Sequence, residues 1–131
     1  GLVGSEMCIR DRSNVYMKKL VKDKVPAFMS QEIVTKLLRD ELGFDKVVLT
    51  SSLSEDAVTK NFSQDYAIVE AVNAGCDVIC QPQRLEEAYQ ILMNAVRTGN
   101  IDEKVINTAV CRILTNKITG GVLVLNNNEM Q

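Results

Sequence analysis

Apolar residues recur along this chain at two alternating spacings, one helical and one typical of buried strands. From Ser30, apolar positions fall every three or four residues, and Gly43 then follows as a residue that commonly ends a helix. Ser30 is a favourable N-cap, and Glu32 suits the positive end of the helix dipole. The pattern predicts a helix up to residue 42 whose buried face carries Ile33, Val34, Leu37, Leu38 and Leu42.

Two short apolar runs without polar alternation are typical of strands that are covered on both faces. They are "KVVLT", residues 46–50, and "CDVIC", residues 76–80. Three more helical stripes come after the first run; Gly75 and Gly99 close two of them, and Asp102 caps the third. Their members are Ala67, Ile68, Ala71 and Val72; Leu85, Ala88, Tyr89, Leu92, Ala95 and Val96; and Val105, Ile106, Ala109, Val110, Ile113 and Leu114. Helices that alternate with fully apolar strands predict parallel βαβ units.

The number of strands is small for a complete α/β domain. Besides the two runs, "NVYMKKLV" at residues 14–21 is a third candidate, and the tail from residue 118 fits neither spacing. The chain therefore has the pattern of the last third of a larger α/β domain.

The first twelve residues, "GLVGSEMCIRDR", show neither periodicity nor continuity with the residues after them. They resemble a translated sequencing-library adapter. We therefore expect residues 1–12 to be foreign, residues 13–117 to form the partial domain, and residues 118–131 to be a tail or linker. The natural protein would then begin upstream of this sequence.

Composition narrows the classes of partner and location. The net charge is −2, and no apolar run approaches the roughly 20 residues of a membrane helix, so we expect neither nucleic acid nor membrane as partner. The basic run at residues 18–24, "KKLVKDK", has no interleaved aromatic residues and is typical of a solvated loop. These features predict a soluble protein.

The cysteines and the missing histidines bear on chemistry. Cys76 and Cys80, at the ends of one strand, would lie about 13 Å apart, whereas a disulfide needs Cα atoms within about 7 Å. Reduced, buried thiols and a cytoplasmic location are therefore expected. The chain has no histidine, which excludes a Ser-His or Cys-His nucleophile pair and the common histidine zinc sites. We expect no metal and no cofactor.

The run "VVLTSSLSED", residues 47–56, places hydroxyls and acids at the carboxyl end of a predicted strand, where α/β enzymes usually hold their chemistry. Together with the preceding residues it resembles the C-terminal part of the catalytic barrel of glycoside hydrolase family 3, in the β-N-acetylhexosaminidase-like branch. The matching residues are Pro26, Ala27, Ser30, Leu37, Leu38, Arg39, Glu41, Leu42, Gly43, Phe44 and Asp45, followed by Ala74, Gly75 and Asp77. The resemblance covers residues 25–117.

The resemblance implies an α/β fold, a C-terminal fragment of a (β/α)₈ TIM barrel. "VVLT" would be the seventh barrel strand and "CDVIC" the eighth, each with its helices. The first half and more of the barrel would be missing from this chain.

The resemblance also implies a retaining mechanism, in which an aspartate at the end of the seventh strand attacks the sugar and water then cleaves the glycosyl-enzyme. Thr50 matches the residue before that aspartate, and Ser51 stands in its place. Ser51 is thus the candidate catalytic position in degenerate form, and Thr50 and Ser52 are candidate substrate-binding residues. A serine without an adjacent base is a weak nucleophile.

The two acids further along are poor substitutes for the missing aspartate. Glu55 and Asp56 lie four and five residues beyond position 51, past the strand end. Productive geometry tolerates only about 0.5 Å of displacement. We expect both to be first-turn helix residues after a Ser54 cap.

Three functional hypotheses remain. The first is a fragment of a retaining O-glycosyl hydrolase, resembling a β-N-acetylglucosaminidase or β-glucosidase, with a β-linked N-acetylglucosamine or glucose substrate. It would be inactive as given, and its acid/base residue would lie outside the chain. The second is a non-catalytic sugar-binding pseudoenzyme, and the third is a truncated α/β unit without function.

Overall fold

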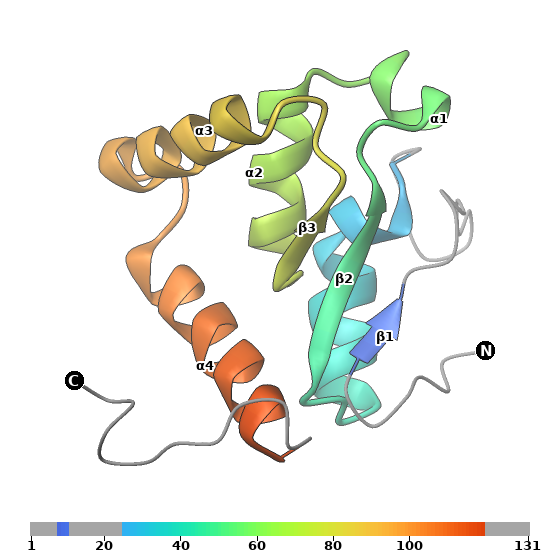
Figure 1. Cartoon of the computed structure of the whole chain (residues 1–131). Coiled ribbons are helices and arrows are strands. Elements are labelled where there is room, and N and C mark those ends of the chain that lie inside the picture. The colour runs from blue at the N-terminus through green and yellow to red at the C-terminus, as the bar shows by residue number, and fades with distance from the viewer. Residues whose placement is uncertain (1–7, 11–24, 120–131) are drawn as a thin grey trace.

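The computed structural model describes residues 8–10 and 25–119 of the 131 residues. Their elements, in chain order, are β1 (Cys8–Arg10), η1 (Ala27–Met29), η2 (Glu32–Glu41), β2 (Val47–Ser52), α1 (Asp56–Thr59), α2 (Gln64–Ala74), β3 (Val78–Cys80), α3 (Leu85–Thr98) and α4 (Glu103–Thr119). In Figure 1, η2 and α2 lie behind the strands, while α3 and α4 lie beyond the β3 side. The strand expected at residues 14–21 and all but the first two residues of the expected tail lie outside the described residues.

The three strands form one parallel sheet in the order β1-β2-β3. The connection from β2 to β3 passes through α2, so the predicted parallel βαβ unit is confirmed. β1 lies within the segment that we expected to be foreign, and it pairs with β2 from Cys8 opposite Val47. The foreign origin of residues 1–12 stays a prediction.

The first predicted helix forms, but with a wider winding than the α-helix. η2 is a π-helix, and its end is closed by the Leu42 amide, which donates to the Leu37 carbonyl five residues earlier. The predicted Ser30 cap is wrong by one residue, because the cap position is Gln31 and no side chain caps the helix. Ser30 contributes its backbone carbonyl, which accepts from Val34 at 2.9 Å. This is an ordinary backbone bond of the first helical turn, so it does not involve the serine hydroxyl.

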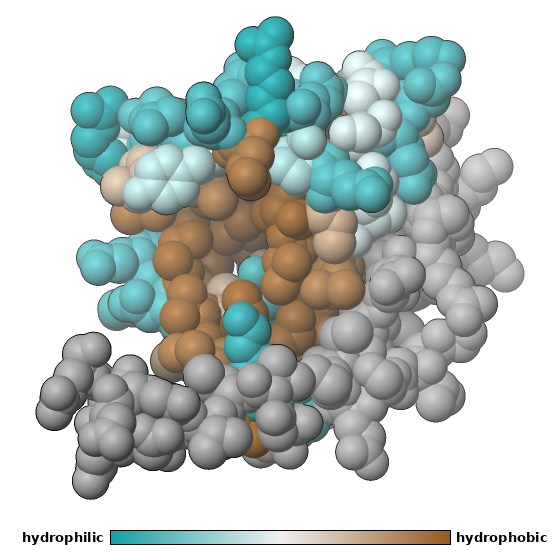
Figure 2. Space-filling view, in the orientation of Figure 1, coloured by the Kyte–Doolittle hydropathy of each residue, from teal (hydrophilic) through white to brown (hydrophobic). Residues whose placement is uncertain are grey.

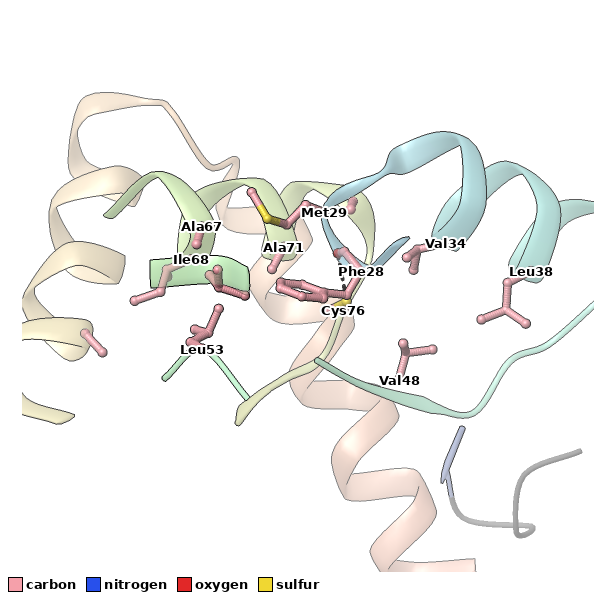
Figure 3. Packing of buried hydrophobic residues seen from close by; sticks show 13 residues of the cluster. Phe28, Met29, Val34, Leu38, Val48, Leu53, Ala67, Ile68, Ala71 and Cys76 are labelled. Atoms are coloured by element: carbon pink, nitrogen blue, oxygen red, sulfur yellow. Dashed lines mark hydrogen bonds between the residues drawn. The ribbon is translucent and has the colours of Figure 1, made fainter. Parts of the chain in front are cut away.

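The core lies between η1, η2, α2 and the sheet. Phe28 of η1 is fully buried, and Figure 3 shows its ring beside Ile68 and Ala71 of α2. The Cys76 thiol donates to the Phe28 carbonyl at 3.3 Å. The small side chains of α2 let η1 approach closely, and burial of one such phenylalanine contributes about 1.5–3 kcal/mol. The predicted buried face of α2 is confirmed.

The end of α2 is seated directly on η2. Gly75 has φ of +115°, and a Cβ there would lie 2.9 Å from the Thr35 hydroxyl oxygen. That hydroxyl donates to the Ala74 carbonyl at 2.7 Å. Glycine is therefore required at position 75 for two reasons, the left-handed backbone and the close approach of η2.

The apolar stripes of α3 and α4 are only partly buried. Ala88 and Ala95 are buried, but Leu85 and Tyr89 are 76% and 59% exposed, so the prediction of one buried stripe on α3 is wrong at these positions. They line an apolar hollow of about 390 Å³ between β3, α3 and α4. Figure 2 shows this hollow as the hydrophobic centre of the face in view. The sheet order leaves β3 at one edge, and no further described strand pairs with it there.

Candidate functional site

The carboxyl ends of β2 and β3 lie side by side and bring the candidate residues to one edge of the sheet. Leu49 pairs with Val78, and Ser52 pairs with Cys80, so β2 advances three residues while β3 advances two. Thr50 and Ser51 are the residues between the two pairs. This extra residue is a β-bulge, a feature often found where a strand presents a side chain to a site.

Hydroxyl groups hold this edge together. The Thr50 hydroxyl accepts from the Cys80 amide at 2.9 Å, and the Ser54 hydroxyl donates to the Gln81 carbonyl at 2.9 Å. The Ser52 hydroxyl accepts from the Ser54 amide at 3.2 Å. Hydroxyls that looked like ligand-binding groups in the sequence therefore bind the neighbouring backbone.

The structure brings all three candidate residues to this edge. Thr50 and Ser51 are 1% and 6% exposed, while Ser52 is half-buried. The catalytic role of position 51 and substrate binding by Thr50 and Ser52 stay predictions. The Ser52 hydroxyl hydrogen has no acceptor among the described residues, so it can donate to a molecule at the edge.

The two acids lie past the strand, as expected, but the helix cap differs from the prediction. α1 begins at Asp56, and its N-cap is Glu55. Ser54 does not cap the helix, because its hydroxyl donates to Gln81 across the sheet edge. Asp56 is exposed and forms an ion pair with Lys60 at 3.0 Å.

A buried ionic cluster sits at the opposite, amino end of β3. The Asp77 carboxylate is fully buried and accepts from Arg39 of η2 at 2.8 Å and from Arg112 of α4 at 2.9 Å. It also accepts from the Val48 amide of β2 at 3.0 Å. Arg39 donates in addition to the Gly75 carbonyl at 2.7 Å. One carboxylate thereby joins η2, β2, β3 and α4.

The electrostatics of this cluster are governed by burial. Burial lowers the pKa of Arg39, and the neighbouring Asp77 carboxylate opposes that effect. An arginine starts so far above neutral pH that it stays charged. Arg39 is thus a permanent buried cation whose charge is balanced by Asp77.

In the sequence, Arg39 and Asp77 matched a family pattern without an assigned role, and the importance of Arg112 was missed. A signal was present, because Asp77 is the one charge in the apolar run "CDVIC". A charge within a buried strand must be paired, so it predicts a buried cation nearby. The identity of the second cation depends on how α4 packs, which no local pattern specifies.

The remaining predictions on ligands and thiols can be compared with the described residues. Among them, no three His, Cys, Asp or Glu side chains are placed to hold one metal ion, and no helix is long and apolar enough to cross a membrane. Cys76 is buried and Cys80 half-buried, and neither forms a disulfide within the described residues. Cys111 is exposed on α4, so the expectation of buried thiols is wrong there.

Comparisons with known proteins agree on one family. The family model described as "Glycosyl hydrolase family 3 N terminal domain" matches residues 11–116. The β-N-acetylglucosaminidase/β-glucosidase of Cellulomonas fimi is 29% identical over 101 residues, which are 77% of this chain and 18% of that protein. The chain therefore spans about a fifth of this relative.

Solved structures give the same result. The glycoside hydrolase family 3 β-N-acetylglucosaminidase from Paenibacillus sp. str. FPU-7 has 34% identity and a TM-score of 0.74, over 82% of this chain and 22% of that one. The β-N-acetylglucosaminidase from Thermotoga maritima has 23% identity and a TM-score of 0.76, over 83% of this chain and 24% of that one. The second match bears on the fold alone. Together they confirm the predicted fold class, a part of a (β/α)₈ barrel.

Proposed function

Because the chain belongs to glycosyl hydrolase family 3, we propose that it is part of a retaining O-glycosyl hydrolase for β-linked N-acetylglucosamine or glucose. We further propose that Ser51 leaves the chain, as given, unable to hydrolyse these sugars. The observation that carries the proposal is a hydroxyl at position 51, at the carboxyl end of β2, where the family resemblance puts the attacking aspartate.

A serine is a poor replacement for the attacking aspartate. Its hydroxyl must lose a proton as it attacks the sugar, and this chain has no histidine to accept that proton. Asp56 is exposed and paired with Lys60 beyond the strand end, so its carboxylate faces solvent and not the site. Removal of a catalytic nucleophile lowers the rate by about 10⁶-fold in a well-studied hydrolase.

A second candidate function is sugar binding without cleavage. The Ser52 hydroxyl, which has a hydrogen left to donate within the described part, favours this interpretation. The third hypothesis, a truncated unit without function, requires no sugar binding at all. A cytoplasmic location remains part of the proposal, supported by Cys76, Cys80 and Cys111, none of which forms a disulfide within the described residues.

The test uses aryl glycosides, because a p-nitrophenolate leaving group departs without help from a general acid. The unaltered chain, Ser51→Asp and the control Ser51→Ala are incubated with p-nitrophenyl β-N-acetylglucosaminide and β-glucoside. We expect no nitrophenol release from the unaltered chain or Ser51→Ala, and a glycosyl adduct on Ser51→Asp by intact mass spectrometry.

Release by the unaltered chain that disappears in Ser51→Ala would refute the loss of catalysis. Binding of a β-linked N-acetylglucosamine disaccharide to the unaltered chain, measured by saturation-transfer NMR, would favour the sugar-binding alternative if no product forms. Absence of both binding and adduct in all three chains would favour the truncated unit.

A further inference from the structure

The bulge at the end of β2 has an unusual attachment to β3. Cys80 is bonded on both sides to the β2 segment: its amide donates to the Thr50 hydroxyl at 2.9 Å, and its carbonyl accepts from the Leu53 amide at 3.1 Å. In a regular parallel ladder, one residue bonds backbone groups two positions apart on its neighbour. Here the two partners lie three positions apart, and one of them is a side chain.

The pairing decides which faces the residues occupy. Val78 and Cys80 are two positions apart and therefore share a face of the sheet, so their partners Leu49 and Ser52 share that face too. Thr50 and Ser51 fit between these partners, and both are buried. Without the extra residue, alternation would return position 51 to the face of Leu49.

From this geometry we infer that Thr50 is a positioning residue for position 51. Its hydroxyl ties the bulge to the backbone of β3, and the bulge sets the face from which the side chain at position 51 projects. Valine has the shape of threonine without the hydroxyl, so Thr50→Val would leave the bulge without its side-chain bond. Serine retains the hydroxyl, so Thr50→Ser would keep it.

This inference takes its catalytic meaning from the proposed function, which makes position 51 the place of the nucleophile. Its test needs neither sugar nor turnover, so a failure of the positioning role can be distinguished from a failure of the proposed function. The test uses the full chain with Ser51→Cys as a reporter thiol. Two native cysteines serve as internal references, since Cys76 is buried and Cys111 is exposed.

The rate of alkylation by iodoacetamide is measured at each cysteine by peptide mass spectrometry. In the Ser51→Cys chain, the reporter should react much more slowly than Cys111, because position 51 is 6% exposed. Adding Thr50→Val should raise the reporter's rate by about tenfold, as expected when one buried hydrogen bond is lost. Adding Thr50→Ser should leave the rate within about twofold of the reporter alone, since serine keeps the bond.

Equal reporter rates in the valine and serine variants would overturn the inference. A rise at Cys76 together with the reporter would also overturn it, because the effect would then be a general loss of structure. Amide hydrogen exchange in the Ser51→Cys chain adds a measurement that needs no change at position 50. A folded chain in which the Cys80 amide exchanges as fast as an exposed amide would contradict the bond itself.

Discussion

The buried ionic cluster offers the sharpest test of what holds β2 against β3. Asp77→Asn preserves the size of the side chain and removes its charge. The asparagine oxygen can still accept from the Val48 amide, which Asp77 contacts at 3.0 Å. The change therefore isolates the charge that balances the two guanidinium groups of Arg39 and Arg112.

The loss of stability caused by Asp77→Asn depends on how deeply each charged group is buried. The side chains of Asp77 and Arg39 are 0% and 8% exposed, so Arg39 cannot regain hydration without structural rearrangement. Removing one partner of such a buried pair costs about 3–5 kcal/mol. Arg112 is 26% exposed and can reach solvent, so its share is smaller. We expect a loss of about 3 kcal/mol in the free energy of unfolding.

The same chemical change at an exposed pair provides the control. Asp56, the first residue of α1, lies 3.0 Å from Lys60, the residue just after that helix, and their side chains are 82% and 72% exposed. Asp56→Asn should cost about 0.5 kcal/mol or less, and that loss should vanish in 1 M salt. The effect of Asp77→Asn should persist in salt because its partners are shielded from ions.

The assay is pulse proteolysis in a urea series, which works at dilute protein and reads the folded fraction directly. With a slope of about 1–3 kcal/mol per molar urea, a 3 kcal/mol loss lowers the midpoint by about 1–3 M. If the Asp77→Asn midpoint moves no further than that of Asp56→Asn, the cluster does not stabilise the fold, and the reasoning from burial is wrong.

Three further changes test other parts of the structure. Gly75→Ala should lower the free energy of unfolding by about 2–3 kcal/mol, because the position has a φ of +115° and a Cβ there lies 2.9 Å from a neighbouring oxygen. Gly43→Ala, where the space is open, should lower it by about 1 kcal/mol. Equal urea midpoints for the two variants would contradict the close approach at position 75. The exposed apolar hollow should make the chain self-associate. The double variant Tyr89→Lys, Val110→Lys should therefore raise the fraction of monomer measured by sedimentation velocity. An unaltered chain that is monomeric and melts sharply would count against this. A hydrogen bond from Ser63 lowers the pKa of Asp65, so the small stabilising effect of the ionised carboxylate is full above the ordinary pKa near 4 and is lost as pH falls through the lowered pKa. Asp65→Asn should therefore lower the urea midpoint at pH 7, and this difference should shrink as the pH falls below 4; a difference that does not change with pH would contradict it.

Much of the fold could be predicted because helical spacing and capping are local. The buried face of α2 agrees with its apolar spacing, and Gly75 ends that helix in the left-handed conformation as expected. The Asp102 cap is confirmed, since its carboxylate accepts from the Lys104 amide at 2.9 Å. Each of these features depends on residues within one or two turns of each other.

The errors have a common cause in contacts between distant residues. The sequence predicts that Ser54 caps a helix. In the structure that helix, α1, has four residues, and the Ser54 hydroxyl donates instead to the Gln81 carbonyl across the sheet edge. Leu85 and Tyr89 fit a buried stripe by spacing, yet burial requires a covering element, and none of the described elements supplies it. The spacing of apolar residues shows that their side chains share one face of a helix, but it does not show which element, if any, covers that face.

By itself, the sequence determined the alternation of helices and strands, the parallel βαβ unit and the place of position 51 at a strand end. These features could be predicted because apolar periodicity, helix-ending glycines and the residues that match the family are all short patterns of neighbouring residues. Only the tertiary structure decided that Asp77 joins Arg39 to Arg112, and that Thr50 binds Cys80 within a bulge. These partners lie 30 to 38 positions apart along the chain. Thr50 and Cys80 meet because parallel pairing sets β2 and β3 in one register, which is a property of two strands together. Asp77 meets the two arginines because η2 and α4 both pack at the amino end of β3.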